Sequence, residues 1–493
     1  MAEVLDRDGA GGSRDEIATE IPSRHLPAVP YRDLPEPVGL GKVLGPGVIL
    51  LAAAIGSGEF VIWPYIASQA GLSLMWLAML GVLTQYFINM EIERYTLATG
   101  ETAVTGFTRL WRPWGLLFIV MTVVPWAWPG WATGASTTFT FAFGLSEGAI
   151  VPITILLLIA IGIALTVSPV VYQTVEKAQF VMVGLILLFL AAAVALGIDG
   201  AGWSAFGSAL ASPQDIPAGI EAVPAAVLLG ALAFAGAGGS LNLVTSNWMR
   251  DKNMGMGAHI PKIVSPFTGE EEAIPATGYF FRQDEANLRR WRAWWRVANW
   301  EQFLTFFVLG TLAIVLLSVL TFATIGTADV GEQFDFIRAE GEALQDRVAP
   351  WFGTTFWLIG SIVLLSTNLG VLDMVGRVTA DVLKTGQLRD SERWTESRLY
   401  FIVVWAEIVF GSTILLAGFD QPLVLLVIAS SLNGIVMFVY SFLLIRLNRG
   451  VLPATIGLKG GRLVMMWWAV VFFGGFSLFV VFDQIRNLLT GGG

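Results

Sequence analysis

The sequence has few of the residues from which soluble enzymes build their sites. It contains no cysteine and only two histidines, and 14% of its 493 residues are charged. Without cysteine the chain forms no disulfide, thiolate metal site or thiol nucleophile. His25 and His259 both stand in polar stretches and suggest neither a zinc cluster nor a catalytic relay. Soluble proteins carry about 25% charged residues, so the composition argues against an ordinary cytosolic enzyme. The sequence also lacks any Ser-His, Cys-His or HExxH constellation, so we do not expect an enzyme. The net charge of −9 argues against a nucleic-acid partner.

Apolar residues, glycine and tryptophan are abundant instead. Hydrophobic residues make up 55% of the chain, which also contains 54 glycines and 19 tryptophans, a composition typical of membrane helices and their interfacial belts. A bilayer core about 30 Å thick requires roughly 20 apolar residues per helix. The sequence therefore predicts an all-α integral membrane protein with eleven transmembrane helices. The predicted spans are residues 46–68, 73–97, 114–143, 149–168, 178–197, 222–249, 299–325, 352–383, 399–418, 422–445 and 464–485.

The positions of Lys and Arg predict the orientation of these spans, because short cytoplasmic loops are enriched in both residues. When the N-terminus is placed in the cytoplasm, only Arg338, Arg347 and Arg486 of the 29 Lys and Arg fall on the outer side. We therefore expect a multi-pass protein of the plasma (inner) membrane, surrounded by the lipid bilayer. Its N-terminus would be cytoplasmic and its C-terminus would be outside.

Three segments outside the spans have their own composition. Residues 1–40 mix proline, glycine and charge without an apolar run, which predicts a mostly disordered cytoplasmic tail. Residues 250–298 form the longest cytoplasmic loop. The Arg- and Trp-rich sequence at 288–300 suits a helix that lies at the inner leaflet. We expect residues 326–350 to form an acidic, solvated outer loop.

The spans divide into a unit at 41–200, a unit at 215–448 and a final span at 460–488. Because each unit holds five spans, the second starts on the opposite side of the membrane, which is the topology of an inverted repeat. The first span of each unit contains a glycine-rich stretch, at 54–60 and at 233–242. Such paired interruptions mark the midplane site of many transporters, so we predict that both helices are unwound there. Close packing of helices through small residues is the alternative.

Short motifs near these stretches carry a resemblance. They are Gly-Pro-Gly at 45–47, the first glycine-rich stretch itself, the segment 70–76, Gln85, and Thr-Gly-Glu-Thr at 99–102. Together they resemble the Nramp (natural resistance-associated macrophage protein) family of metal-ion transporters, in the amino acid–polyamine–organocation superfamily. The resemblance covers most of residues 40–485. It implies a LeuT-type fold, a 5+5 inverted repeat with unwound helices 1 and 6, and inward movement of divalent metals together with protons.

The resemblance breaks down at the substrate site, which is atypical. The family has Asp-Pro-Gly-Asn in span one and Met-Pro-His in span six, whereas this chain has Gly-Ser-Gly-Glu at 56–59 and Gly-Ser-Leu at 239–241. Thioether and imidazole ligands favour transition metals, whereas oxygen ligands favour magnesium and calcium. The replacements therefore argue against the usual Asp/Met transition-metal site. The first of them is instead similar to the Gly-Ser-Gly motif of amino-acid permeases, whose broken helices hold a substrate carboxylate.

Two kinds of substrate fit this sequence. One is a hard divalent cation (Mg/Mn-like) taken up with protons, for which Glu59 and Asn242 are the candidate metal ligands. The other is a small anion or zwitterion (bicarbonate, a carboxylate or an amino acid), bound by exposed backbone amides at the ends of the broken helices. For both, the predicted substrate-binding residues are Gly56, Ser57, Gly58, Glu59, Gly236, Gly239, Ser240 and Asn242.

Polar residues inside the spans are candidates for ion coupling, because a charge at the bilayer centre costs at least about 2.5–3.5 kcal/mol. Asp373 stands four residues before Arg377, so an internal ion pair is the simplest interpretation there. Two neighbouring hydroxyls on the same span offer oxygens to a sodium ion, although such hydroxyls more often bond to their own helix. No cofactor is expected beyond a bound H⁺ or Na⁺. The coupling candidates are Glu59, Glu407, Asp373, Ser366 and Thr367.

Overall fold

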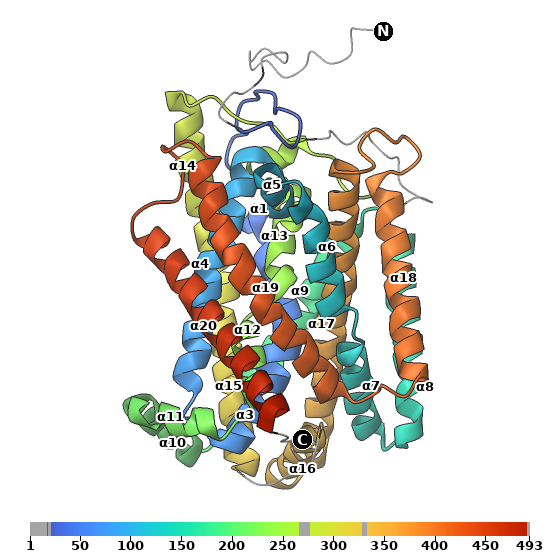
Figure 1. The fold of residues 1–493 in the computed structure, drawn as a ribbon. Helices are drawn as coiled ribbons and strands as arrows, with labels where there is room; N and C mark the ends of the chain where they lie inside the picture. The colour runs from blue at the N-terminus through green and yellow to red at the C-terminus, as the bar shows by residue number, and fades with distance from the viewer. Residues whose placement is uncertain (1–16, 18–20, 266–276, 328–332, 491–493) are drawn as a thin grey trace.

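The computed structural model describes residues 17, 21–265, 277–327 and 333–490, and these are almost entirely helical (Figure 1). Every predicted span overlaps one helix or a run of consecutive helices. These helices are α2 (Pro46–Ala54), η1 (Ile55–Ile62), α3 (Trp63–Ala70), α4 (Met75–Thr99), α6 (Pro113–Trp126), α7 (Gly130–Phe143), α8 (Ile150–Val167), α9 (Val171–Leu196), α12 (Ala225–Ala233), α13 (Gly239–Asp251), α14 (Glu285–Gln302), η5 (Phe303–Val308), α15 (Leu309–Ile325), α17 (Pro350–Thr385), α18 (Glu396–Leu416), α19 (Pro422–Gly450) and α20 (Gly461–Thr490).

Nine helical stretches of the described residues are long and apolar enough to cross a membrane. Two of the eleven predicted spans are not among them. The second span, α4, carries polar side chains that include Gln85, Asn89 and Glu91, which lower its mean hydropathy. The sixth span is divided between α12 and α13, and neither piece is long enough to cross by itself. One of the two missing spans therefore contains several polar side chains, and the other has an interrupted backbone.

The helices differ in how much of their surface is covered. In the most apolar 18 residues of the stretch Pro46–Ala70 every residue is buried, whereas less than half of the corresponding residues of α8, α9, α18 and α20 are buried. The exposed side chains on those four helices include large apolar residues, among them Leu156, Leu188, Leu416 and Leu478. A continuous apolar exterior of this kind fits contact with lipid. The first span thus lies at the centre of the bundle, where lipid does not reach it.

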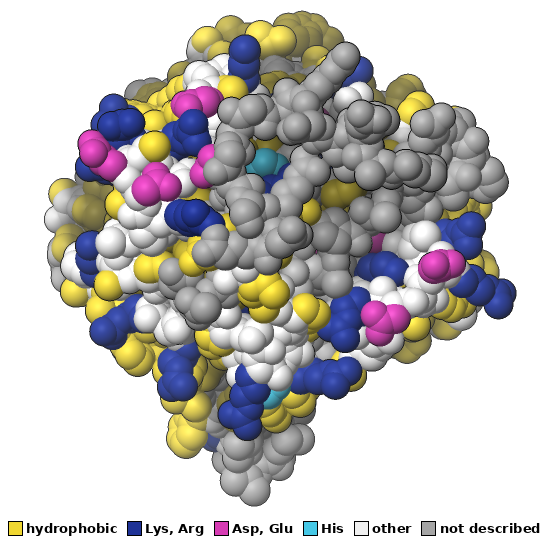
Figure 2. Space-filling model, turned by 90° about the horizontal axis from the view of Figure 1, so that it is seen from above, with side chains coloured by type: hydrophobic (Ala, Val, Ile, Leu, Met, Phe, Trp, Pro, Cys, Tyr) yellow, Lys and Arg dark blue, Asp and Glu magenta, His cyan; other side chains and the backbone are white. Residues whose placement is uncertain are grey.

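The two ends of the bundle carry different short elements. At the end drawn uppermost in Figure 1 lie α1 (Leu40–Val43) and α5 (Ala103–Leu110), and at the lower end lie α10 (Gly200–Ala211), α11 (Ile216–Glu221) and α16 (Asp335–Arg347). Seen from above, the upper face carries Lys and Arg around much of its rim (Figure 2). The upper end is the one that our orientation assigns to the cytoplasm.

The segment 21–39, which we call the N-terminal strap, differs from the disordered tail that we predicted at 1–40. Ile21 and Leu34 are buried. Arg109 Nη1 of α5 donates to the carbonyl oxygens of Pro22 and Pro27, at 3.0 Å each. The Leu34 amide donates to Asn287 Oδ1 of α14 at 2.9 Å. The prediction is therefore wrong for the strap; residues 1–16 and 18–20 lie outside the described residues.

Two other loop predictions also need correction. The basic, Trp-rich segment does not lie flat at the inner leaflet, because α14, η5 and α15 form one continuous helix of 41 residues, Glu285–Ile325. The acidic outer segment is not simply a solvated loop, because it contains α16, which packs on α17. Phe336, Ile337 and Leu344 of α16 are buried, and Trp357 Nε1 of α17 donates to the Ile337 carbonyl at 3.0 Å. Residues 266–276 and 328–332 of these loops lie outside the described residues.

Candidate substrate site at the glycine-rich stretches

The sixth span is interrupted near its middle. Helix α12 ends at Ala233 and α13 begins at Gly239. Gly236 and Gly238 lie between the two helices and Gly239 is the first residue of α13; their φ angles are 113°, 75° and 53°. Residues other than glycine rarely adopt this left-handed region, so the three glycines permit the change of direction. The backbone groups that leave the helix here need other partners, because the membrane interior offers no water.

Gln85 of α4 supplies those partners. Its Nε2 donates to the carbonyl oxygens of Ala233 at 2.7 Å and Ala235 at 2.8 Å. Its Oε1 accepts from the Gly238 amide at 3.0 Å and from Asn242 Nδ2 at 3.3 Å. One side chain therefore replaces several helical hydrogen bonds. From the sequence, Gln85 was part of a family motif but was not predicted to bond to the interruption; a glutamine in a largely apolar span was the available signal.

The first span is not unwound, so that part of the prediction is wrong. Its glycine-rich stretch forms the π-helix η1, in which the backbone stays helical but turns more widely. A Cβ atom added to Gly58 would lie 1.5 Å from the Phe234 carbonyl oxygen, and one added to Gly56 would lie 2.1 Å from Thr367 Oγ1. The glycines here allow close packing, which is the alternative that the sequence left open. The side chain of Ser57 lies outside the described residues.

Glu59 projects from η1 beside the interrupted span. Its side chain is fully buried, and neither carboxylate oxygen has a hydrogen-bond partner among the described residues. The Gly236 amide lies close enough to interact with this carboxyl group. Asn242 is also buried, and its Oδ1 likewise has no partner within the described ranges, while its Nδ2 donates to Tyr440 Oη at 3.1 Å. The structure thus places Glu59, Gly236, Gln85 and Asn242 around one point.

Gly239 and Ser240, the other predicted residues of span six, contact different helices. Ser240 Oγ accepts from Thr122 Oγ1 at 2.9 Å, and the Ser240 amide donates to Asn433 Oδ1 at 3.4 Å. A Cβ added to Gly239 would lie 1.7 Å from the same Asn433 oxygen. Gly239 and Ser240 are therefore packed against α19 and α6, and the Ser240 amide is already occupied.

Aromatic rings cover this side of the interruption. Trp126 stacks on Trp131 with ring centroids 5.0 Å apart and lies 5.4 Å from the Phe234 ring. Trp126 Nε1 donates to Asn433 Oδ1 at 2.8 Å. The surroundings of the interruption are thus polar around Glu59 and Gln85 and aromatic around Phe234.

Ser366 and Thr367 of α17 bond to the first span. Thr367 Oγ1 donates to the Ala53 carbonyl at 2.8 Å, and Ser366 Oγ lies 3.3 Å from the Ala52 carbonyl. Ser366 also bonds to Gln179 of α9. These hydroxyls therefore sit against span one, where the sodium hypothesis places them, and they hold its last regular helical turn before η1.

Asp373 and Arg377 form the predicted ion pair, with Oδ2 and Nε 2.7 Å apart. Both oxygens of Asp373 have further donors, because Trp248 Nε1 and Tyr400 Oη each lie 2.8 Å away. Arg377 also pairs with Asp251 at the end of α13. Asp373 belongs to a buried network above the interruption and is not exposed to it as a free carboxylate.

More ion pairs connect the elements at the upper end. Arg250 of α13 pairs with Asp381 of α17 at 3.0 Å and with Glu396 of α18 at 2.6 Å. Arg109 Nε donates to Glu101 Oε2 at 2.7 Å. Burial alone would raise the pKa of Glu101, but the charge and hydrogen bonds of Arg109 outweigh it, so this pKa lies below its ordinary value. The sequence did not reveal these pairs, because most of the partners are distant in the chain.

The structure does not bring Glu407 to the site. Glu407 lies on α18, at the edge of the bundle and away from α12 and α13 (Figure 1). Its Oε2 has no partner in the part of the chain that the structure describes. Glu407 is therefore no part of the arrangement around Glu59.

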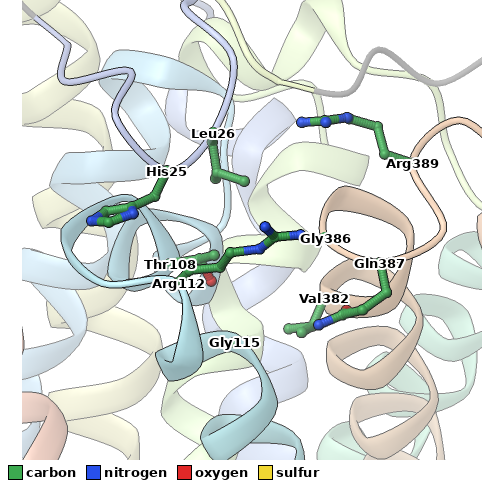
Figure 3. A pocket seen from close by; sticks show the side chains of 9 residues that line it. All are labelled: His25, Leu26, Thr108, Arg112, Gly115, Val382, Gly386, Gln387 and Arg389. Atoms are coloured by element: carbon green, nitrogen blue, oxygen red, sulfur yellow. The ribbon is translucent and has the colours of Figure 1, made fainter.

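A separate small cavity of about 60 Å³ lies at the upper end (Figure 3). It lies between the N-terminal strap, the helices α5 and α6, and the end of α17. Arg112 and Arg389 give its lining positive charge. Its full lining is His25, Leu26, Thr108, Arg112, Gly115, Val382, Gly386, Gln387 and Arg389. This cavity shares no residue with the arrangement around Glu59.

The donors at the interruption limit what it binds. In the described residues, no group of three or more His, Asp or Glu side chains is arranged to hold a metal ion. A cation at this point would have the Glu59 carboxylate, the Asn242 carbonyl oxygen, backbone carbonyls and water as ligands. A donor set with few carboxylates and retained water suits magnesium-like ions.

The fold has solved counterparts. The Eremococcus coleocola manganese transporter, in complex with an aromatic bis-isothiourea substituted compound, matches with a TM-score of 0.66 and 13% identity, over 97% of this chain and 93% of that chain. Mhp1, a nucleobase-cation-symport-1 family transporter with bromovinylhydantoin bound, matches with a TM-score of 0.52 and 13% identity, over 94% and 97%. MhsT in complex with L-phenylalanine matches with a TM-score of 0.53 and 14% identity, over 88% and 97%.

These identities are low enough that the likeness shows the fold alone. The chain has the LeuT-type fold that these membrane transporters share. No protein-family model and no curated protein matches the sequence.

Proposed function

We propose that the protein is an Nramp-related secondary active transporter that works by alternating access, with its substrate site between η1 and the interruption of span six. The shared fold and the nine long apolar helices support this proposal. In it, residues 41–200 and 215–448 are inverted repeats and 460–488 is the eleventh span. The protein lies in the plasma membrane with its upper end in the cytoplasm.

We propose further that the substrate is a hard divalent cation, Mg/Mn-like, taken up together with protons. The observation that carries this proposal is Glu59, a fully buried carboxyl group whose two oxygens have no hydrogen-bond partner among the described residues. A buried carboxylate is costly unless it is paired, and it otherwise holds a proton. Glu59 therefore binds either a cation or a proton, and exchange between the two links their movements.

The alternative substrate, a small anion, is less well supported. Two of the amides at the interruption are already used, because Gly238 donates to Gln85 and Ser240 donates to Asn433. The amides of η1 remain within a helix. An anion would also lie next to Glu59, the charge of which would repel it.

A zwitterion is the better second candidate. The aromatic group of Trp126, Trp131 and Phe234 offers ring faces, which attract cations. An ammonium group could then pair with Glu59, with the apolar part of the molecule on the rings. The structures of Mhp1 with bromovinylhydantoin bound and of MhsT in complex with L-phenylalanine are examples of this fold holding an organic molecule.

Uptake into proteoliposomes separates these substrates. Purified protein would be tested with radiolabelled manganese, with magnesium followed by a fluorescent indicator, and with labelled amino acids and bicarbonate. We expect saturable uptake of the divalent ions that is driven by an inward proton gradient and lost in Glu59→Gln. Glu407→Gln is the matched control, because it neutralises an intramembrane carboxyl group away from the site. Divalent uptake at the wild-type rate in Glu59→Gln would contradict the proposal, and uptake of amino acids alone would favour the zwitterion.

A further inference from the structure

A line of polar side chains leads upward along α4 from the interruption. Asn89 and Glu93 follow Gln85 at intervals of four residues, so the three lie on one face of the helix. All three are fully buried. Both amide atoms of Asn89 and both oxygens of Glu93 lack a hydrogen-bond partner among the described residues. Buried groups of this kind are rare in native proteins, and each calls for an explanation such as a bound water or ion.

A second carboxyl group meets this line from α14, which packs against α4. Glu301 and Gln302 lie at the end of α14 and are fully buried. Glu93 lies close enough to Glu301 for the two carboxyl groups to interact, with the Gln302 amide next to them. Glu301 Oε2 and both amide atoms of Gln302 have no partner in the described ranges. Two buried carboxyl groups thus approach each other with unused donors and acceptors beside them.

The charged groups that face Glu93 do not neutralise it. Arg462 of α20 faces Glu93, but its Nη1 also lies 3.7 Å from Glu91 Oε1, and its guanidinium bonds to Asn299. Tyr86, from α4 itself, also lies close enough to interact with Glu93.

Glu301 has its own charged neighbours. Lys252 from the end of α13, and Glu176 and Tyr172 from α9, all interact with it. Lys252 is paired with Glu176, with Nζ and Oε1 2.5 Å apart. Lys252 is therefore already used, whereas Arg462 faces both Glu93 and Glu91, and Arg94 already binds Glu91 at 2.7 Å. Two close carboxyl groups that face one shared cation do not both ionise, so the pair retains a proton.

Glu301 also contacts the helix that carries Glu59. Its Oε1 accepts from the Gly47 amide at 2.8 Å and lies 3.4 Å from the Gly45 amide, at the first turn of α2. An ionised carboxyl group is favourable at a helix N-terminus and loses that advantage when it is protonated. The proton content of the pair therefore bears directly on how firmly the upper end of span one is held.

We propose that Glu93 and Glu301 form a second proton-binding site, at the upper end of a polar path that runs from the interruption along Gln85 and Asn89. This inference rests on the proton coupling in the proposed function. A proton moves along the path when an O–H bond at one carboxyl group breaks and another forms on water or on the next carboxylate, with no change in oxidation state. The amide groups of Asn89 and Gln302 offer hydrogen bonds to the water molecules that carry it.

Infrared spectroscopy of the full-length protein in lipid tests the site without any substrate. In a pH titration, we expect a band from a protonated, buried carboxyl group that is absent in Glu93→Gln and in Glu301→Gln. Glu340→Gln is the matched control, because Glu340 is a buried carboxyl group at the opposite end of the bundle; it should remove only its own contribution and leave the band of the pair. Glu93→Asp keeps the carboxyl group and should shift the band without removing it, which separates loss of the group from loss of the fold. If the band is the same in wild type and in both glutamine variants, the proposal is wrong.

Proton flux tests the path itself. In proteoliposomes that contain a pH-sensitive dye, we expect Glu93→Gln to lower manganese-driven proton entry by about a hundredfold, while manganese binding measured by calorimetry is unchanged. Wild-type proton entry in this variant would overturn the inference. If the wild-type protein does not transport manganese, the proposed substrate fails, and the infrared titration still decides whether the carboxyl pair binds a proton.

Discussion

The two glycine-rich stretches have similar compositions and different backbones. In span six the helix stops, three glycines take positive φ angles and Gln85 bonds to the freed groups. In span one the backbone stays helical as η1, and its glycines let Phe234 and Thr367 approach. Glycine permits both outcomes, and a polar side chain from a neighbouring helix decides between them. The two stretches also contribute differently to the candidate site. The stretch in η1 contributes the Glu59 carboxyl group, whereas the stretch in span six contributes a change in backbone direction.

The strongest test of this contrast is Gly58→Ala. The added Cβ would lie 1.5 Å from a backbone oxygen of the other stretch, which cannot move away cheaply. We expect a loss of about 3 kcal/mol or more, seen as a lower melting temperature in tryptophan fluorescence. In the control Gly184→Ala, no atom lies within 4 Å of the new Cβ, and the helix should gain about 1 kcal/mol. An unchanged melting temperature for Gly58→Ala would show that the two stretches do not touch.

The next largest effect is expected for Gln85→Leu. It leaves the carbonyls of Ala233 and Ala235 and the amide of Gly238 without their partner. Each unpaired buried group costs about 1–3 kcal/mol, and we expect a total loss of about 3 kcal/mol in thermal unfolding. Asn89→Leu, on the same face of α4, breaks no hydrogen bond among the described residues and should cost little. Equal losses in the two variants would mean that Gln85 does not support the interruption.

A smaller effect is expected on the side of span one. Thr367→Val keeps the shape of the side chain but removes the hydrogen bond to the Ala53 carbonyl, which should cost about 1 kcal/mol. The control is Thr355→Val, because among the described residues the Thr355 hydroxyl bonds to the Trp351 carbonyl of its own helix, in an exposed position. A loss of stability as large as that of Gln85→Leu would indicate that η1 depends on hydrogen bonds from other helices as much as span six does.

The last prediction concerns a region outside both stretches. Burial raises the pKa of Glu340 from 4.5 to about 8, against an opposing hydrogen bond from Thr321. The folded state therefore keeps a proton that the unfolded state releases, so the docking of α16 is most stable below pH 4.5 and weakens as the pH rises toward 8. Hydrogen exchange of residues 335–347, corrected for intrinsic rates, should show this trend in the wild type. In Glu340→Gln the trend should vanish, and its persistence would assign the pH dependence to another group.

The long helices were predictable from sequence because apolar runs of their length have few alternatives in a membrane. The position of the interruption in span six was also predictable, since three glycines stand within four residues. The state of span one was not, because the sequence does not show that Gln85 reaches only one of the two stretches. A membrane helix with unsatisfied backbone stays helical where it can.

Most of the misses involve contacts between distant parts of the chain. The pairing of Arg250 with Glu396 and the hydrogen bonds from Arg109 to the strap join residues that have no sequence relationship. Helix α16 could have been predicted from the sequence, because Phe336, Ile337 and Leu344 form an apolar face within an acidic segment. The line of Gln85, Asn89 and Glu93 was equally visible as polar residues four apart in a span.

The N-terminal strap joins two parts of the upper end. It bonds to α5 through Arg109 and to α14 through Asn287, so any movement that separates these helices has to break one attachment or stretch the segment between them. Residues 21–39 thus tie α5 to α14, and a deletion within them would shorten the connection between these two helices.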